Sequence, residues 1–355
     1  MTTPAAKNNN YGALRLLFAY LVIISHSAEL ADGDRHREPL TMLFGTLSFG
    51  TIAVAGFFLI SGALISKSFQ TTSTTSGYLA KRVLRIYPGF IVAFLASLTI
   101  VGALSGATPH LADAPSLIVI NLKRLMLLQT PDLPGAFAGT PYASLNGSMW
   151  TLAYEFRCYL LVALIGSCMA LTRQRAVIVA ASLAMIAAGA LPLPTPPGVI
   201  IGLIGDPQQT LLLTGTFGIG AGFQLYADTI AYRGRYALAA AVILIIAMTS
   251  PLLANLGVAL AGGYLIFWFA LAVRSAPLAR IGRDTDISYG VYLYAFPVQK
   301  LILWRMPNLD PSLVTVITAA AATLLAWQSW TWIEKPAMAR YRADALRRSQ
   351  SAVPV

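Results

Sequence analysis

The sequence predicts an all-α integral membrane protein, a polytopic helical bundle of about ten transmembrane helices with both termini in the cytoplasm. Its 355 residues are 57% hydrophobic and only 11% charged, whereas a soluble domain usually carries about a quarter charged residues. Apolar runs of roughly 20 residues, long enough to cross a bilayer, recur along the whole chain. Lysine and arginine are concentrated in alternate connections, as the positive-inside rule requires.

Ten apolar segments are expected to span the membrane. They lie near residues 12–29, 43–65, 87–105, 147–170, 176–191, 209–227, 236–252, 255–273, 287–304 and 312–333. Of the 25 lysine and arginine residues, 18 fall on the side of the N-terminus and 6 on the far side, which places both ends in the cytoplasm. We expect one integral-membrane domain over residues 1–340 and a basic cytoplasmic tail over 341–355. A shorter apolar patch at 117–128 predicts an interfacial or re-entrant helix.

The net charge and the cysteines exclude several classes of function. Orientation in the membrane and contact with anionic membrane lipid account for the net charge of +11, so no nucleic acid partner is implied. Cys158 and Cys168 lie in one predicted helix, about 15 Å apart along its axis, which is too far for a disulfide between them. Their spacing also fits no metal site.

The first apolar segment contains two ionisable residues, Arg15 and His26. Eleven helical residues turn through about 1,100°, so the two side chains share one face and are separated by roughly 16 Å along the axis. Ionisable groups at membrane depth are costly and therefore point to function. A histidine suits a general base, because an ordinary imidazole exchanges a proton near neutral pH. The alternative, a packed histidine and an arginine that only anchors the helix, has about equal weight on this segment alone.

Two motifs follow, one at the end of the second span and one that leads into the third. GFFLISGALI (56–65) contains small residues, including Ser61, that permit close helix approach, and packing is its first interpretation. In GYLAKRVLRIYPGF (77–90), Arg82 and Arg85 project from one helical face beside Lys81. Paired arginines suit phosphate groups, which each guanidinium can grip with two donors. Anchoring by the positive-inside rule is the equally weighted alternative.

Polar residues also enter the fourth and ninth spans. Glu155 lies in an otherwise apolar helix and needs a partner or a function, whereas Trp150 and Tyr154 suit a membrane interface. In DISYGVYLYAFPVQK (286–300), the spacing clusters the hydroxyls of Ser288, Tyr289 and Tyr292, and Pro297 predicts a kink that frees backbone groups. These residues fit either a polar cavity lining or a hydrogen-bonded kink. Glu334, before Lys335 and Pro336, predicts a helix stop at the cytoplasmic surface.

Taken in order, these motifs resemble those of the acyltransferase-3 family of integral-membrane O-acyltransferases. The resemblance covers nearly the whole chain: Arg15 with His26, GFFLISG, Arg82 and Arg85 followed by IYP, SMWTLAYE, SYGVYLYAFP and IEKP. The chain departs from the family at Ala295, where many members carry a histidine. His26 is therefore the only histidine in a predicted span.

The resemblance implies a multi-pass protein of the bacterial inner membrane that transfers an acyl group, commonly acetyl, from cytoplasmic acyl-CoA to a cell-surface saccharide or its lipid-linked precursor. Acyl-CoA is then a co-substrate, and no bound cofactor or metal is implied. We expect the stand-alone form of the family, without an SGNH domain, which acts alone or with a separate partner of a polysaccharide assembly pathway. O-antigen, exopolysaccharide, a lipid-linked oligosaccharide and a secondary metabolite all fit as acceptors.

The residues fit a mechanism of this kind. Arg82 and Arg85, with Arg15 or Lys81, would bind the phosphates of coenzyme A, and the pantetheine arm would reach toward His26. His26 would act as general base, with Glu155 as its orienting carboxylate and with Tyr289, Tyr292 or backbone groups freed by Pro297 as oxyanion donors. An acyl-histidine intermediate is the alternative chemistry.

Two other classes of function fit parts of the same pattern. A transporter or flippase for a lipid-linked saccharide would also place His, Glu and Arg in the membrane, although no repeated halves are visible in the sequence. An inactive scaffold for a polysaccharide assembly would not need the complete set of ionisable residues.

Overall fold

A computed structural model of the chain describes residues 9–110, 113–168, 170–194, 197–198, 201 and 204–341. These residues form helices and connecting loops, and no strand occurs among them. All but one residue (Tyr341) of the predicted basic tail, 341–355, lie outside the described residues. The all-α class is confirmed.

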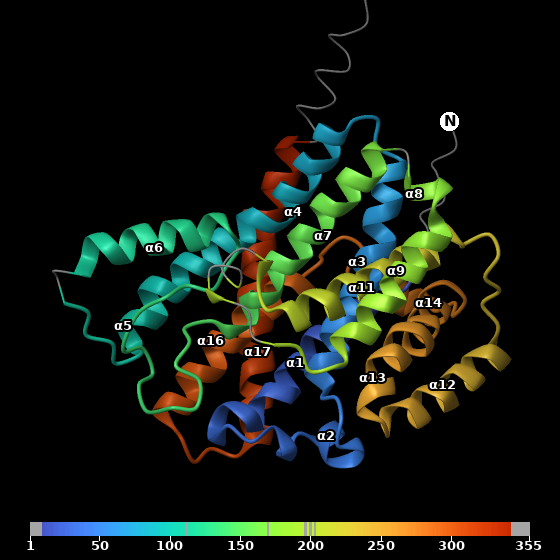
Figure 1. The fold of residues 1–355 in the computed structure, drawn as a ribbon. Coiled ribbons are helices and arrows are strands. Elements are labelled where there is room, and N and C mark those ends of the chain that lie inside the picture. Colours follow the sequence, from blue (N-terminus) through green and yellow to red (C-terminus); the bar gives the residue numbers. More distant parts are fainter. Residues whose placement is uncertain are drawn as a thin grey trace, which may run out of the picture.

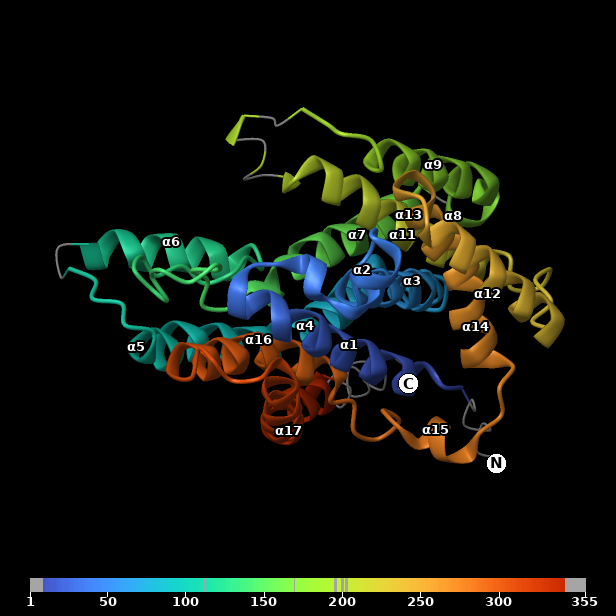
Figure 2. The same cartoon turned by 90° about the horizontal axis from the view of Figure 1, so that it is seen from below.

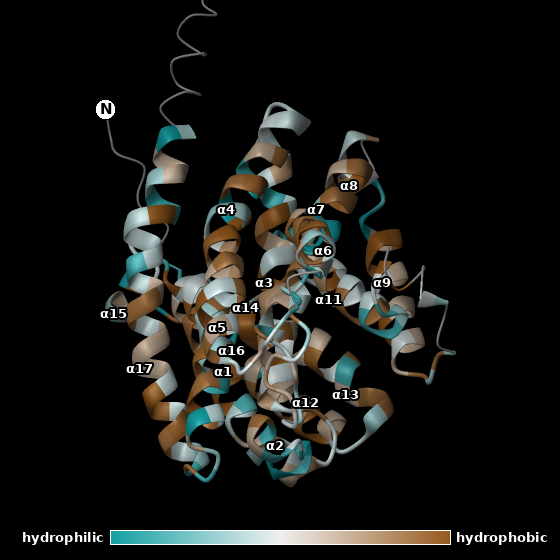
Figure 3. Cartoon of the chain, turned by 90° about the vertical axis from the view of Figure 1, so that its left-hand side faces the viewer, coloured by the Kyte–Doolittle hydropathy of each residue, from teal (hydrophilic) through white to brown (hydrophobic). Residues whose placement is uncertain are grey.

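Six helical stretches are long and apolar enough to cross a membrane, which confirms a multi-pass membrane protein. They are α1 (Tyr11–Asp32), α3 (Phe49–Gln70), Thr75–Leu104 (α4, Thr75–Ala96, with η2, Ser97–Val101, and α5, Gly102–Leu104), Gly147–Ser167 (η4, Gly147–Met149, and α7, Trp150–Ser167), Pro251–Leu271 (α13, Pro251–Gly257, η5, Val258–Gly262, and α14, Gly263–Leu271) and Pro311–Tyr341 (α17, Pro311–Ser329, η6, Trp330–Glu334, and one further helical segment). Hydrophobic residues run along these helices in Figure 3.

The other four predicted spans are helices, but the predicted number of crossings is not confirmed. Two are only 15 residues long, α9 (Arg175–Gly189) and α12 (Gly234–Met248), or about 22 Å against a hydrocarbon thickness of about 30 Å. The remaining two are α11 (Pro207–Leu225) and α16 (Ser288–Arg305). In α16, Gln299, Lys300 and Arg305 lower the mean hydropathy.

Short helices fill the connections. They are η1 (Arg35–Arg37), α2 (Pro39–Phe44), α6 (Ala114–Met126), α8 (Ala170–Arg173) and α15 (Ala276–Arg280). The short helix expected near 117–128 is α6, which projects sideways from the bundle in Figure 1. Ile118, Val119 and Leu122 on α6 are exposed, which suits the predicted position at a membrane interface.

Two boundary predictions are wrong. The third span begins at Thr75 instead of residue 87, so Arg82 and Arg85 lie within α4 and Pro88 is inside the helix. Glu334 does not stop a helix at the surface, because the helix continues through a π turn to Tyr341 and the Glu334 side chain is buried. Both errors arise because proline is tolerated inside membrane helices, where neighbouring groups satisfy the freed backbone.

The centre of the bundle consists of α1, α3, α4, α7, α16 and α17. Figure 2 shows α1, α4 and α16 close together at the centre of the molecule. Along α1, Arg15 contacts Asp286 just before α16, and His26 contacts Phe296 within it, so α1 and α16 run in the same direction. The contacts of Tyr20 with Thr323 and of Ser27 with Thr315 on α17, both at 2.7 Å, show that α17 runs back. The two ends of the described chain therefore lie at the same end of the bundle, while their cytoplasmic placement stays a prediction.

The glycines of the GFFLISGALI segment have the packing role that the sequence favoured. A Cβ atom added to Gly62 would lie 2.0 Å from the carbonyl oxygen of Phe217 on α11. In return, a Cβ atom on Gly220 of α11 would lie 2.1 Å from the carbonyl oxygen of Leu59. The backbones of α3 and α11 thus meet directly at these two glycines.

We expect Gly62→Ala to lower the thermal unfolding temperature of the detergent-purified protein, because a methyl group here displaces backbone instead of a flexible side chain. Overpacking of this kind costs about 1–3 kcal/mol or more. Gly234→Ala is the matched control, because an added Cβ at Gly234 meets nothing within 4 Å. Equal unfolding temperatures for the two variants would contradict the close approach of α3 and α11.

Candidate active site

A cavity of about 140 Å³ lies among α1, α3, α4, α7 and α16, and we call it the arginine cavity. Its polar lining comprises Arg15, Ser61, Arg82, Arg85, Thr151, Glu155, Tyr159, Ser288, Tyr289 and Tyr292. The sequence analysis had selected eight of these ten residues from five separate motifs. The fold brings them to one place, although helices and loops separate them in the chain.

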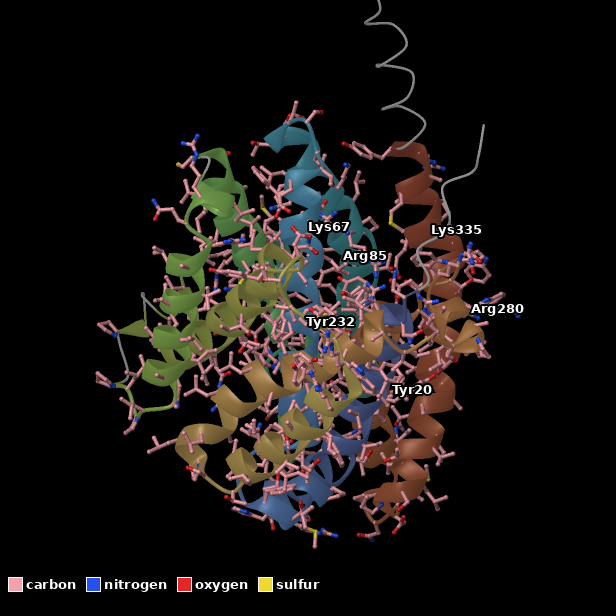
Figure 4. The ribbon with its side chains drawn as sticks, turned by 90° about the vertical axis from the view of Figure 1, so that its right-hand side faces the viewer. Tyr20, Lys67, Arg85, Tyr232, Arg280 and Lys335 are labelled. Carbon is pink, nitrogen blue, oxygen red and sulfur yellow. The ribbon has the colours of Figure 1, made fainter. Side chains whose placement is uncertain are left out.

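Arg85 is the most heavily paired of the three cavity arginines. Its guanidinium donates to Asp286 Oδ2 at 2.6 Å and to Glu334 Oε2 at 3.4 Å. Arg15 Nη2 lies 3.1 Å from the same oxygen of Asp286. Figure 4 places Arg85 among the packed helices, while Arg280 and Lys335 lie at the edge of the molecule.

Asp286 is ionised between these two arginines. Burial alone would raise the pKa of its carboxyl group, but Arg85 and Arg15, with a hydrogen bond from Ser288, outweigh burial and lower the pKa below the ordinary value. The carboxylate therefore keeps its charge at neutral pH and holds both guanidinium groups beside the cavity.

Arg82 differs from Arg85 in its partners. It forms no ion pair with any residue that the structure describes, and its one hydrogen bond goes to Ser68 at 3.4 Å. The Nε atoms of Arg82 and Arg15 are buried without a hydrogen-bond partner among the described residues. An unpaired buried donor costs free energy, so these groups favour an anionic ligand with several acceptor oxygens.

Glu155 lies deeper in the cavity and is already hydrogen-bonded. Its Oε1 atom accepts from Ser61 Oγ at 2.7 Å and from the Tyr159 hydroxyl at 2.6 Å. The hydroxyls of Tyr292 and Thr151 are paired at 2.7 Å. On α16 the cavity lining ends at Tyr292, whose ring packs against Phe57 with centroids 5.8 Å apart.

His26 does not line the cavity; its ring packs against Phe296, one turn past Tyr292 on α16, at 6.0 Å between centroids. The predicted shared face is confirmed, because Arg15 and His26 both lie on the side of α1 that meets α16 and the residues leading into it. The predicted carboxylate partner is wrong. His26 Nδ1 lies 3.3 Å from Glu29 Oε2, whereas Glu155 is held by Ser61 and Tyr159.

Three other predicted site residues lie away from the cavity. Lys81 donates to Thr72 Oγ1 at 3.0 Å. Trp150 packs against Tyr154, whose hydroxyl accepts from the backbone N–H of Asp206 at 2.8 Å. On α7 the cavity side is formed by Thr151, Glu155 and Tyr159 at four-residue spacing, and residues 150 and 154 point elsewhere.

The predicted oxyanion donors are also mostly engaged. Tyr289 donates to the carbonyl oxygen of Ile86 at 2.9 Å, and Tyr292 is paired with Thr151. Pro297 lacks an N–H and so frees the carbonyl of Leu293, which accepts from Asn146 Nδ2 at 2.9 Å. A freed carbonyl is an acceptor and cannot stabilise an oxyanion, so that part of the prediction is wrong.

The sequence analysis missed Glu29, Asp286 and Glu334. Glu29 had a visible signal, since it lies three residues after His26 on a predicted membrane helix and therefore on a neighbouring position. Asp286 is only two residues before Ser288, but Asp284, four residues before Ser288, is a second candidate carboxylate in the same segment. Glu334 was assigned to a helix end because of the proline that follows it.

Comparisons with known proteins show the family of the chain. Residues 8–331 match a family model described as an acyltransferase domain. An O-acetyl transferase of Shigella phage Sf6 is 27% identical over 349 residues, covering 94% of this chain and 97% of the relative. Nodulation protein 10 of Rhizobium leguminosarum bv. viciae is 26% identical over 364 residues, covering 93% of each chain. No solved structure matches. Because the family model spans nearly all of the sequence that forms the bundle and its cavity, this chain belongs to the acyltransferase-3 family.

Proposed function

We propose that the chain is an O-acetyltransferase of a bacterial inner membrane. It takes an acetyl group from cytoplasmic acetyl-CoA and transfers it to a hydroxyl of a saccharide, either at the cell surface or on a lipid-linked precursor. The observation that carries the proposal is the convergence of Arg15, Arg82 and Arg85 on one cavity, at one end of the helix that carries His26. Family membership and the name of the phage relative support acyl transfer over carriage of a saccharide.

The arginine cavity suits the phosphate groups of coenzyme A. Arg82 has no carboxylate partner among the described residues, so its charge is available to a phosphate without breaking an ion pair. Arg15 shares Asp286 with Arg85 and keeps one unpaired donor. The pantetheine arm would then extend past Ser61 and Glu155 toward His26. Arg15 and His26 are separated by roughly 16 Å along the helix, which an extended arm can reach.

His26 would supply the base. It removes the proton from the acceptor hydroxyl, whose oxygen attacks the thioester carbonyl and forms the new ester bond. The bond between the carbonyl carbon and sulfur then breaks, and the thiolate takes the proton from the imidazolium as coenzyme A leaves. Tyr292 and Phe296 lie between the cavity lining and His26 on α16, so the reacting acetyl group would pass these side chains.

The test measures transfer of label from radiolabelled acetyl-CoA to extracted surface glycans of the host, in membranes with matched protein levels. We expect transfer with the wild type and a loss of at least about a hundredfold with His26→Ala, because general base catalysis contributes about 10²–10⁴. Absence of transfer by the wild type with every acyl-CoA tried, while glycan export still requires the protein, would favour a carrier instead.

We expect substitution of Arg82 and of Arg85, the two arginines of the third membrane helix, to have different effects on acetyl-CoA binding and on stability. Arg82→Ala should raise the KM for acetyl-CoA about tenfold to a hundredfold, which corresponds to the free energy of one charge-assisted hydrogen bond. The same substitution should leave the unfolding temperature nearly unchanged. Arg85→Ala should also lower the unfolding temperature, by a free energy of about 3 kcal/mol, because Glu334 loses its arginine and stays buried.

Thermal unfolding in detergent and steady-state kinetics measure both effects. Thermal stabilisation by free coenzyme A gives an independent measure of binding, which we expect to weaken with Arg82→Ala. Equal destabilisation by the two substitutions, or an unchanged KM with Arg82→Ala, would contradict the separate roles of these residues.

A further inference from the structure

We infer that Glu29 is the positioning residue of the catalytic base: it fixes the tautomer and direction of His26 and connects this base to the loop that precedes α7. The inference rests on the proposed function, in which His26 removes the proton from the acceptor. It assigns to Glu29 the role that the sequence had suggested for Glu155.

Glu29 is held from three segments of the chain. Its Oε2 atom faces His26 Nδ1, one turn earlier on α1, at 3.3 Å. Its Oε1 atom accepts from Arg35 Nε at 2.5 Å, just past the end of α1, and from the hydroxyl of Tyr142 in the loop before α7 at 2.6 Å. The Glu29 side chain is 6% exposed, so water replaces none of these contacts easily and the carboxylate has one orientation.

This geometry determines which nitrogen of His26 acts as base. A carboxylate only accepts hydrogen bonds, so the nitrogen that faces it must carry the proton. Nδ1 therefore donates to Glu29, and Nε2 keeps the lone pair that can take a proton from the acceptor. The separation of 3.3 Å is long for such a bond, and we expect it to shorten when the imidazole becomes charged, because charge-assisted bonds are shorter.

Tyr142 is a permanent donor in this arrangement. Burial and its bond to Glu29 both raise the pKa of the Tyr142 hydroxyl, so the proton stays on the tyrosine at any working pH. The same loop is attached to α16, where Lys300 Nζ donates to Thr140 Oγ1 at 2.8 Å, and to α1, where Pro141 packs against Gly33. The orientation of Glu29 therefore depends on the position of this loop against α1 and α16.

The other charged groups near this end of α1 have their own partners. Asp32 pairs with Arg37. Glu38 accepts from the backbone N–H groups of Thr41 and Phe49. On α16, Lys300 bonds Thr140 and lies over the ring of Phe137. Among the described residues, Glu29 is thus the carboxylate that contacts His26.

The first experiment observes the tautomer and the protonation of the His26 imidazole directly and needs no substrate. The chain has three histidines, so a protein with His36→Gln and His110→Gln leaves His26 as the only one for nitrogen NMR of the labelled imidazole. We expect the neutral ring to carry its proton on Nδ1, and we expect its protonation midpoint to move to lower pH when Glu29→Gln is added. The direction follows because the neutral amide stabilises the imidazolium less than the carboxylate does. An unchanged tautomer and midpoint would overturn the inference whether or not acyl transfer is established.

The second experiment compares kcat as a function of pH for the wild type, Glu29→Gln, Glu29→Asp, Tyr142→Phe and Glu155→Gln. Transfer should rise with pH as His26 loses its proton. Glu29→Gln should lower the limiting kcat about tenfold to a hundredfold and leave the KM for acetyl-CoA within about twofold. It should also move the acid limb, the part of the pH profile in which kcat rises with pH, to lower pH. Glu29→Asp should restore part of kcat, and Tyr142→Phe should show a smaller loss.

Glu155→Gln is the matched control, because it also replaces a buried carboxylate by an amide. We expect it to leave the position of the acid limb unchanged, whatever its effect on acetyl-CoA binding. A shift of the limb by Glu155→Gln and not by Glu29→Gln would overturn the inference. If His26→Ala abolishes transfer but Glu29→Gln keeps the full kcat, the inference about Glu29 is overturned and the proposed function stands. If His26→Ala keeps full transfer, the proposed function is overturned. If Glu29→Gln unfolds, Glu29→Asp and Tyr142→Phe still decide the outcome through the acid limb.

Discussion

Arg85 forms the interaction on which the central bundle depends. Its ion pairs with Asp286 and Glu334 join α4 to the start of α16 and to the end of the last helix, and Arg15 adds α1 through the same Asp286. A buried charge without a partner is strongly unfavourable, so each of these groups requires the others to be in place. The cluster thereby holds four helices together at one point, and three of them, α1, α4 and α16, enclose the arginine cavity with α3 and α7.

The two ends of α1 carry different kinds of polar group. Cations gather at the Arg15 end, where three guanidinium groups meet the cavity. At the other end His26 faces Glu29, and polar contacts link Ser27 with Gln299 on α16 and Thr315 on α17. The proposed function requires this separation, because it takes a donor from one side of the membrane and an acceptor from the other, and the phosphates of the donor would stay in water while its acyl group moves inward. The helix rise supplies the distance without any large conformational change.

The all-helical class and most of the polar lining of the cavity could be predicted from sequence, because apolar length, loop charge and helical spacing are local properties. Seven residues singled out as ligands of coenzyme A or lining of a cavity (Arg15, Ser61, Arg82, Arg85, Ser288, Tyr289, Tyr292) and the candidate Glu155 do share one cavity. The pairing of charges could not be predicted, because it depends on which helices become neighbours. The spacing of three residues already made Glu29 a candidate partner of His26, but only the fold shows that Glu155 is held by Ser61 and Tyr159 instead. The prediction that Trp150 and Tyr154 line the cavity was wrong for a simpler reason. One residue turns a helix by about 100°, so these two side chains point away from the side of α7 that carries Thr151 and Glu155.

The distribution of charge around the cavity also explains why three arginines are present where two would grip a phosphate. Asp286 and Glu334 already neutralise much of the charge of Arg85, and Asp286 is shared with Arg15. These pairs stabilise the fold and hold the guanidinium groups in place before any ligand arrives. Arg82 has no such partner among the described residues and lies over the rings of Tyr78 and Tyr159, which orient it without cancelling its charge. One arginine is thus committed to structure, one is shared, and one is left with its charge for an anionic ligand. The net positive charge that this cavity offers to an anionic ligand is therefore smaller than the number of arginines suggests.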